Sequence, residues 1–381
     1  MTRSLRATQY ACMAALGMAM TVVPPLVPAI RDQIHLSYLQ AGMVFSGQFL
    51  GMILTVPFGG HLADRFGKKP FLVVSGLLII AGLAGFAAAS GFASLLLTSV
   101  IAGAGTGGYE VGSNALEADH TAGGHGTSMN LLHLFYGVGA MAGPALSTLV
   151  VQRGWDWRVA PALTAAAPAL VTVALLVQPV GKGVHEAVHE TAAVYRSGAL
   201  WICSAAIAVY VGIEVTVMGW STTFWEQRAP GSAVPASLVP AAFWLMVTLG
   251  RLVCAPVTDR VGLLRFVRVA AAAVLAVGLA WTIAPGPAVT LAAVVLLGLG
   301  LAGIFPTVMA HATVAFPGHA GKVVALLAVF ASLGGFFIPS AVGRVADAQD
   351  IGVLPPIVAA LAAALLLVVR LIPRPAPAPA P

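Results

Sequence analysis

The chain has 381 residues, of which 59% are hydrophobic and only 8% are charged, and its formal net charge is +6. Its mean hydropathy is +0.95, and because a soluble domain carries about 25% charged residues, this composition excludes a soluble globular protein. The three cysteines have no metal-ligand spacing, and no basic stripe with interleaved aromatic residues is present, so we expect no metal, no organic cofactor and no nucleic-acid partner.

Apolar runs of about the 20 residues that a bilayer-spanning helix needs recur along the whole chain. They predict twelve transmembrane helices, at about 7–29, 37–59, 70–90, 93–116, 127–150, 158–179, 198–224, 236–257, 263–284, 287–310, 321–343 and 352–372. Twelve spans use nearly the entire sequence and leave no room for a soluble domain. We therefore predict an all-α integral membrane protein whose main partner is the lipid bilayer.

Lysine and arginine are distributed unevenly between the two sides of these spans. With the N-terminus inside, thirteen of them fall in cytoplasmic segments and five on the other side. Cytoplasmic loops carry an excess of Lys and Arg, so we expect both termini in the cytoplasm. The membrane we expect is an inner (plasma) membrane of the bacterial type.

The sequence matches itself at an offset of 195 residues. The pair Asp64-Arg65 recurs as Asp259-Arg260, and a glycine follows two residues after each pair. The same shift carries Gly108, Ala115, Gly139 and Pro144 onto Gly303, Ala310, Gly334 and Pro339. Internal duplication of hydrophobic halves is typical of transporters, in which the halves rock about a site between them.

The repeat predicts two pseudo-symmetric six-helix bundles, at residues 1–179 and 198–372. Residues 180–197 form the longest polar stretch of the chain, and we expect them to be a cytoplasmic linker. Residues 373–381 are a proline- and alanine-rich tail that has no fold of its own.

The segment GGHLADRFGKK, at residues 59–69, lies between the second and third predicted spans. It resembles the G-x-L-A-D-R-x-G-R-K loop that marks the major facilitator superfamily. The second copy, CAPVTDRVGLLR, keeps the Asp-Arg pair and its glycine but loses the distal basic pair. This resemblance covers the whole chain and implies the fold of that superfamily.

Both copies of the motif predict a gate at the cytoplasmic rim. A glycine at position 60 allows its helix to approach a neighbour closely, and an aspartate four residues later can cap or pair with a helix terminus of the other bundle. The arginine and lysines of the loop are expected to face the anionic cytoplasmic leaflet. The predicted gating residues are Gly60, Asp64, Arg65, Asp259 and Arg260.

Residues 107–144 resemble the fucose-permease-like sugar transporters of the superfamily, which carry Glu-x-x-x-Asn on the fourth span and an asparagine, a polar residue and an aromatic on the fifth. Position by position, the resemblance implies substrate-binding roles for Glu110, Asn114, Asn130, His133 and Tyr136. The residue types fit such a role, because a carboxylate, amides, an imidazole and a phenol supply the donors and acceptors that a hydroxyl-rich ligand needs. The alternative is that the residues of the fourth span only tie it to a neighbouring helix.

Glu214 is the only other acid deep within a predicted span. The fucose-permease pattern places a proton-linked acid on the first span, which is wholly apolar here, so Glu214 becomes the candidate proton carrier, together with Glu110. The alternative for Glu214 is a structural carboxylate beside a polar neighbour. Trp220 and Trp244 are expected to line the substrate site. Arg251 is the one cation within a span, and structural pairing or snorkelling is favoured over substrate contact.

These patterns predict a secondary active transporter that takes up a small hydroxylated, sugar-like solute by proton symport, with the proton gradient as its energy source. Proton-driven efflux of hydrophobic drugs or metabolites is the alternative, because Gly139–Pro144 partly satisfies the Gly-x-x-x-Gly-Pro pattern of antiporters. An enzyme would need a nucleophile or metal cluster near one membrane face, and a receptor would usually append a soluble domain. Neither feature is found, so we predict no enzyme activity and no catalytic residues. We expect the transporter to work as a monomer.

Overall fold

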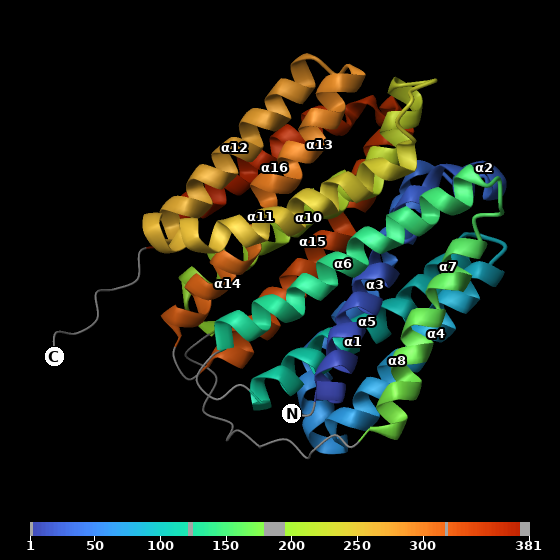
Figure 1. The fold of residues 1–381 in the computed structure, drawn as a ribbon. Helices are drawn as coiled ribbons and strands as arrows, with labels where there is room; N and C mark the ends of the chain where they lie inside the picture. The colour runs from blue at the N-terminus through green and yellow to red at the C-terminus, as the bar shows by residue number, and fades with distance from the viewer. Residues whose placement is uncertain (1–2, 121–124, 179–194, 317–318, 374–381) are drawn as a thin grey trace.

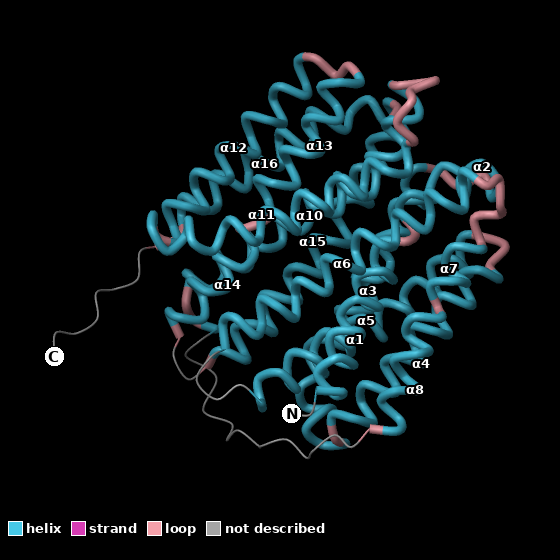
Figure 2. Tube along the Cα trace, in the orientation of Figure 1, coloured by secondary structure: helices cyan, strands magenta, loops and turns pink. Residues whose placement is uncertain are grey.

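The computed structural model describes residues 3–120, 125–178, 195–316 and 319–373, and within these ranges it leaves out the side chains of residues 118–120, 125–130, 255, 259 and 320. The described residues form helices joined by short loops (Figures 1 and 2). The predicted linker and tail lie outside them, except for residues 195–197 and Pro373. Their boundaries therefore stay predictions.

Twelve stretches of the described chain are long and apolar enough to cross a membrane, which confirms the predicted number of spans. The first six are built from α1 (Arg3–Thr21), η1 (Pro24–Leu26), α2 (Val27–Ile34), α3 (Tyr38–Phe66), α4 (Lys68–Ala88), α5 (Phe92–His120), α6 (His125–Gln152), α7 (Val159–Thr164) and α8 (Ala166–Val177). The last six are built from α10 (Gly198–Arg228), η2 (Ala236–Leu238), α11 (Val239–Val261), α12 (Leu263–Ile283), α13 (Pro287–Leu301), α14 (Ile304–Ala315), α15 (Ala320–Gln349), η3 (Ile351–Val353) and α16 (Leu354–Leu371).

The spans gather in two groups (Figure 1). Elements α1–α8, which we call the first half, lie together on one side, and α10–α16, the second half, lie on the other. The described chain begins and ends at the same end of the molecule, which we call the terminal end; the other is the opposite end. Inside a bilayer no water is available to the backbone N–H and C=O groups, so they must be hydrogen-bonded within the protein. This requirement explains why nearly every apolar run is helical.

A glycine with positive φ joins two helices at the equivalent place in each half. Gly67, between α3 and α4, has φ of 93°, and Gly262, between α11 and α12, has φ of 86°. Side chains other than glycine rarely adopt such a conformation. These junctions explain why the glycine of the repeated motif recurs. They also correct the expectation of a loop, because α3 continues to Phe66 and α11 to Val261.

The repeat is also visible in helix packing. A Cβ added to Gly139 on α6 would lie 1.9 Å from the carbonyl oxygen of Ala14 on α1. A Cβ added to Gly334 on α15, 195 residues later, would lie 1.9 Å from the carbonyl oxygen of Ala208 on α10. In both halves the first and fifth spans therefore approach so closely that only glycine fits, as small residues allow in membranes.

The two halves meet mainly along α3 and α15, with α6 against α11. Several hydrogen bonds between the halves involve the first part of α3, near the opposite end. The backbone N–H groups of Tyr38 and Leu39 donate to the Asp347 carboxylate at 2.6 and 3.0 Å, and Gln227 donates to the Tyr38 hydroxyl at 2.7 Å. Farther in, the Ser46 and Ser340 hydroxyls lie 3.2 Å apart. The boundary is thus closed at the opposite end.

Candidate functional site

A buried tyrosine–glutamate pair lies about halfway along α10. The Tyr210 hydroxyl donates a hydrogen bond to Glu214 Oε1 at 2.9 Å, across one helical turn. Glu214 is 8% exposed and Tyr210 is 1% exposed. An ionisable group at this depth is costly unless it is partnered, so its presence marks a functional candidate.

Arg251 on α11 joins this pair. The charge of the Arg251 guanidinium acts on both the Tyr210 hydroxyl and the Glu214 carboxylate. Structural pairing or snorkelling of Arg251 therefore stays a prediction. Its charge acts on the proposed proton carrier and its tyrosine, so we add Arg251 to the candidate site, from which the sequence analysis had left it out. The sequence already distinguished Arg251, because it is the one cation within a predicted span.

The first half faces this group with α6. The charge of Arg251 acts on both His133 and Tyr136, and Tyr136 is also within electrostatic range of Glu214. The Tyr136 ring packs edge-on against Trp244 of α11, with ring centroids 5.5 Å apart. Residues from both halves therefore converge at one place on the boundary between them, as a site that serves alternating access requires.

Helix α5 adds Glu110 and, one turn later, Asn114, both half-buried. Glu110 lies within electrostatic range of Tyr136, which ties α5 to the same cluster. The Asn114 Oδ1 atom is buried without a hydrogen-bond partner among the described residues, and so is the indole nitrogen Nε1 of Trp244. Buried polar atoms are almost always hydrogen-bonded, so the Trp244 donor beside Tyr136 is available to a polar ligand.

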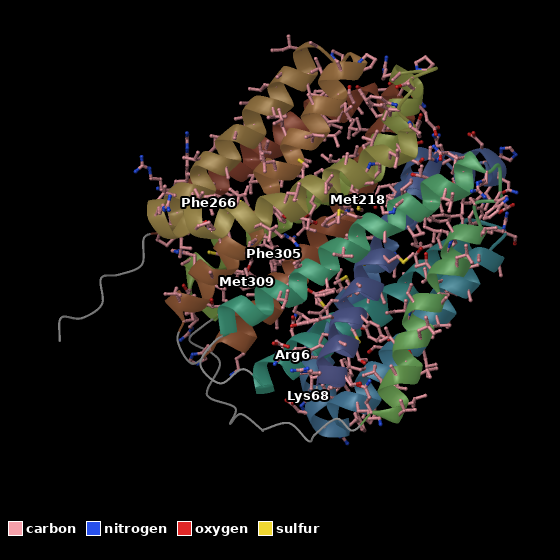
Figure 3. The ribbon with its side chains drawn as sticks, in the orientation of Figure 1. Arg6, Lys68, Met218, Phe266, Phe305 and Met309 are labelled. Carbon is pink, nitrogen blue, oxygen red and sulfur yellow. The ribbon has the colours of Figure 1, made fainter. Side chains whose placement is uncertain are left out.

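Apolar side chains of the second half lie beside the polar cluster. Phe305 on α14 packs against Tyr210 with ring centroids 5.9 Å apart. Figure 3 labels Phe305 and, one turn farther along α14, Met309. The site thus combines hydrogen-bonding groups with an aromatic wall.

Two predicted binding residues lie elsewhere or cannot be placed. Trp220 is fully buried at the closed boundary toward the opposite end, where its indole donates to the Pro339 carbonyl at 3.1 Å and its ring packs edge-on against Phe45 of the first half at 5.1 Å. It therefore takes part in closure in this conformation, and its role toward substrate stays a prediction. The Asn130 side chain lies outside the described residues.

The predicted gating residues lie at the terminal end. Gly60 has no atom within 4 Å of an added Cβ, so the expected close helix approach is wrong for this conformation. Asp64, Arg65 and Arg260 are exposed, and Asp64 makes no hydrogen bond or ion pair with any described side chain. The Asp259 side chain lies outside the described residues.

The lysines of the motif do not simply face the membrane surface, as the sequence suggested. Lys68 is 5% exposed and donates to the Ala115 carbonyl at 3.0 Å. Lys69 donates to the carbonyls of Leu176 and Gln178, both at 2.8 Å. Cations at helix C-termini satisfy carbonyls that the helix leaves unpaired, so Lys69 fastens the end of α8. Lys68 ties α4 to the last two turns of α5. Lys68 lies with Arg6 at the terminal end of the first half (Figure 3).

Comparisons with known proteins agree with this architecture. The chain is 27% identical over 142 residues to multidrug resistance protein fnx1 of Schizosaccharomyces pombe, a match that covers 37% of this chain and 26% of that protein. The chain thus spans about a quarter of this relative's length. It is 24% identical over 333 residues to the nitrite extrusion protein of Bacillus subtilis, which covers 84% of this chain and 82% of the relative.

The fold itself is that of a solved transporter. A crystal structure of a D-xylose–proton symporter superposes with a TM-score of 0.80 over 98% of both chains, at 15% sequence identity. The family model of the Major Facilitator Superfamily matches residues 10–339. With twelve spans in two halves and a polar site between them, the chain is a transporter and not an enzyme, and it belongs to the Major Facilitator Superfamily.

Proposed function

We propose that this transporter is a proton-coupled symporter that takes up a small hydroxylated solute by alternating access. We further propose that the terminal end faces the cytoplasm from a bacterial-type inner membrane, with the proton gradient as the energy source. The charge distribution supports this orientation, because the sequence assigns thirteen Lys and Arg residues to that side and five to the other.

The observation that carries the proposal is the buried hydrogen bond between Tyr210 and Glu214, on which the charge of Arg251 acts beside α6. When Glu214 is ionised, its negative charge offsets Arg251. When Glu214 takes up a proton, Arg251 keeps its charge and becomes available to a ligand in a site of low dielectric constant. Proton binding and ligand binding therefore favour each other, and this linkage is the requirement for symport.

The substrate class follows from the groups that remain unsatisfied. The Asn114 acceptor, the Trp244 donor and the hydroxyl of Tyr136 can bind a solute that carries several hydroxyl groups. The aromatic wall suits the apolar face of a sugar-like ring. Arg251 favours a solute that also carries a carboxylate, because guanidinium and carboxylate form strong charge-assisted hydrogen bonds.

Proton-driven efflux of hydrophobic drugs is the second candidate. One feature of the site favours it, the apolar ring of Phe305 packed against Tyr210 of the polar cluster. The similarity of one segment to a multidrug resistance protein points the same way. The two candidates differ in whether the hydrogen-bonding groups or the apolar wall provide most of the binding.

Transport by the purified protein in proteoliposomes distinguishes the candidates. With the outside acidic, uptake is measured for a neutral sugar, a sugar acid and a lipophilic cation. We expect accumulation of the sugar or the sugar acid and no pH-driven movement of the cation. Movement of the cation against its gradient, with no response to either hydroxylated solute, would establish efflux in place of symport.

Two variants test the roles of the acids within the same assay. Glu214→Gln mimics the protonated carboxyl, so it should abolish accumulation while exchange of substrate across the membrane continues. Glu110→Gln should instead weaken substrate binding by about 1.5–3 kcal/mol, the contribution of a charge-assisted hydrogen bond. Glu226→Gln, on the same helix as Glu214 but near the opposite end, is the control. The reverse pattern in the two site variants would exchange their assigned roles.

A further inference from the structure

A cavity of about 560 Å³ opens at the terminal end of the second half, away from the central site. Its walls come from the beginning of α12, from α14 and from the end of α16. Three arginines, Arg265, Arg268 and Arg370, share these walls with the buried His311. No acidic residue is among the lining residues that the structure describes.

The beginning of α12 concentrates positive charge in this cavity. Gly262 and the three residues after it line the wall, so the cavity lies at the helix N-terminus, where unpaired backbone N–H groups attract anions. A cation in the first helical turn opposes the helix dipole. Arg265 occupies that turn and is exposed, so its placement does not stabilise the helix.

Arg268 fixes the geometry of the cavity. Its guanidinium donates to the backbone carbonyls of Val369, Arg370 and Ile372 at 3.4, 3.2 and 3.2 Å. These bonds hold the end of α16 against α12 and bring Arg370 to the same cavity as Arg265. The two outer arginines are exposed, and none of the ion pairs among the described residues involves them.

The equivalent corner of the first half is built differently. There the basic residues after the glycine junction are Lys68 and Lys69, and both donate to backbone carbonyls of neighbouring helices, at Ala115 on α5 and at the end of α8. After the glycine junction of the second half, Arg268 serves this purpose, and Arg265 makes no such bond to a described residue. The charge of Arg265 and Arg370 is therefore left for a group that is not part of the described chain.

The surroundings of the cavity identify that group as part of a lipid. Val269 on the cavity wall is 63% exposed, and Leu367 and Leu371 on α16 are 62% and 60% exposed. On a membrane protein such an apolar outer surface faces acyl chains. A basic pocket between spans, next to an acyl-facing surface, is the arrangement that recognises anionic lipid headgroups.

We propose that this cavity binds the phosphate of an anionic phospholipid. Arg265, Arg370 and the N-terminus of α12 contact the phosphate, and the acyl chains lie along the outer faces of α12 and α16. Because Gly262 is part of both the cavity and the second gating motif, a bound lipid also contacts the junction at which α11 turns into α12.

Native mass spectrometry of the purified protein tests the proposal. Bound lipid is counted during titration with phosphatidylglycerol or with phosphatidylcholine of the same acyl chains. The wild type should retain phosphatidylglycerol at lower concentration than phosphatidylcholine. Arg265→Gln/Arg370→Gln should raise the half-saturating phosphatidylglycerol concentration on the order of tenfold, as expected for two arginines near a lipid phosphate. The phosphatidylcholine titration should not change.

The matched control is Arg153→Gln/Arg344→Gln, which removes two exposed arginines at the opposite end and makes the same change in net charge. It should retain phosphatidylglycerol like the wild type, and both double variants should keep the wild-type melting temperature in phosphatidylcholine. Equal loss of phosphatidylglycerol in both double variants, or none in either, would overturn the proposal. Displacement of the lipid by millimolar inorganic phosphate would assign the cavity to a free anion.

Discussion

The two ends of the boundary between the halves differ in how α3 meets the second half. Near the opposite end, α3 shares hydrogen bonds with α15 and α10, and Gly42 and Gly343 lie against backbone of the facing half. Near the terminal end of the same helix, a Cβ added to Gly60 would meet no atom of a neighbouring helix within 4 Å, and Asp64 is exposed. One continuous helix therefore closes one end while it leaves the other end unpaired, the asymmetry expected of one state in an alternating-access cycle.

The largest effect is expected from a side chain that prevents closure at the opposite end. A Cβ at Gly343 would lie 2.4 Å from the Tyr38 carbonyl oxygen of the other half, and a backbone atom cannot move aside easily. Gly343→Val should destabilise the closed state by roughly 1–3 kcal/mol, the usual effect of overpacking. Transport should fall about tenfold to a hundredfold.

Thiol accessibility measures this change directly. A cysteine at Ser340, in a background without the three native cysteines, should react much faster with a membrane-impermeant reagent from the opposite side in the Gly343→Val variant. Gly60→Val is the control, because an added side chain there meets open space. If Gly60→Val opened the opposite end as strongly as Gly343→Val, the comparison between the two ends would be wrong.

A smaller effect is expected from the hydrogen bonds that cap α3 across the halves. Asp347→Ala removes the acceptor for the Tyr38 and Leu39 N–H groups, and because the carboxylate is exposed, we expect a loss of about 1 kcal/mol in the closed state. Transport should slow a few-fold, and labelling at position 340 should rise. Asp350→Ala is the matched control, since Asp350 pairs with Arg228 within the second half. Equal effects of the two variants would indicate general destabilisation and not loss of closure.

The number and order of the spans could be predicted from sequence because the bilayer sets both their length and their composition. The repeat could be predicted as well, because Gly67 and Gly262 need positive φ and Gly139 and Gly334 lie against backbone in both halves. The ends of the helices could not be predicted from the sequence. The polar end of α3, up to Phe66, is helical although its sequence looks like a loop, since the helix needs no apolar residues where it leaves the membrane.

The sequence predicts which residues belong to the candidate site, but not which of them lie next to one another. Glu110, His133, Tyr136 and Glu214 are polar residues within apolar spans, so composition alone exposes them. The place of Arg251 depends on how α11 packs against α10, which no local pattern encodes. Trp220 could not be placed from its residue type. A tryptophan within a span can line a ligand site or pack in the closed boundary between the halves, and only the packing of the helices shows that Trp220 lies at the boundary.

A moderate effect that depends on conformation is expected at the terminal end. Asp64 has no partner among the described side chains in this conformation, so Asp64→Asn should leave substrate binding and thiol labelling at position 340 unchanged. Transport should still fall a few-fold, because the aspartate acts only when the terminal end closes. Asp32→Asn, an exposed aspartate at the other end of the molecule, should have no effect on transport. Loss of binding together with transport would show that Asp64 serves folding and not the gate.

The smallest effect is expected from an ion pair at the opposite end that lies within one half. Asp156 and Arg158 are 3.3 Å apart and partly exposed. Slight burial alone would raise the pKa of Asp156, but the hydrogen bond from the Arg158 backbone and the guanidinium charge hold the pKa below its usual range. The stability from this pair is therefore complete above the unfolded-state pKa of about 4 and is lost as the pH falls through the lower folded value. Asp156→Asn should lower the free energy of unfolding by no more than about 0.5 kcal/mol at neutral pH, a difference that disappears in acid.

Because the pair does not cross the boundary, labelling at position 340 should match the wild type. An increase in that labelling would mean that closure at the opposite end depends on the surface of the first half as well as on α3 and α15.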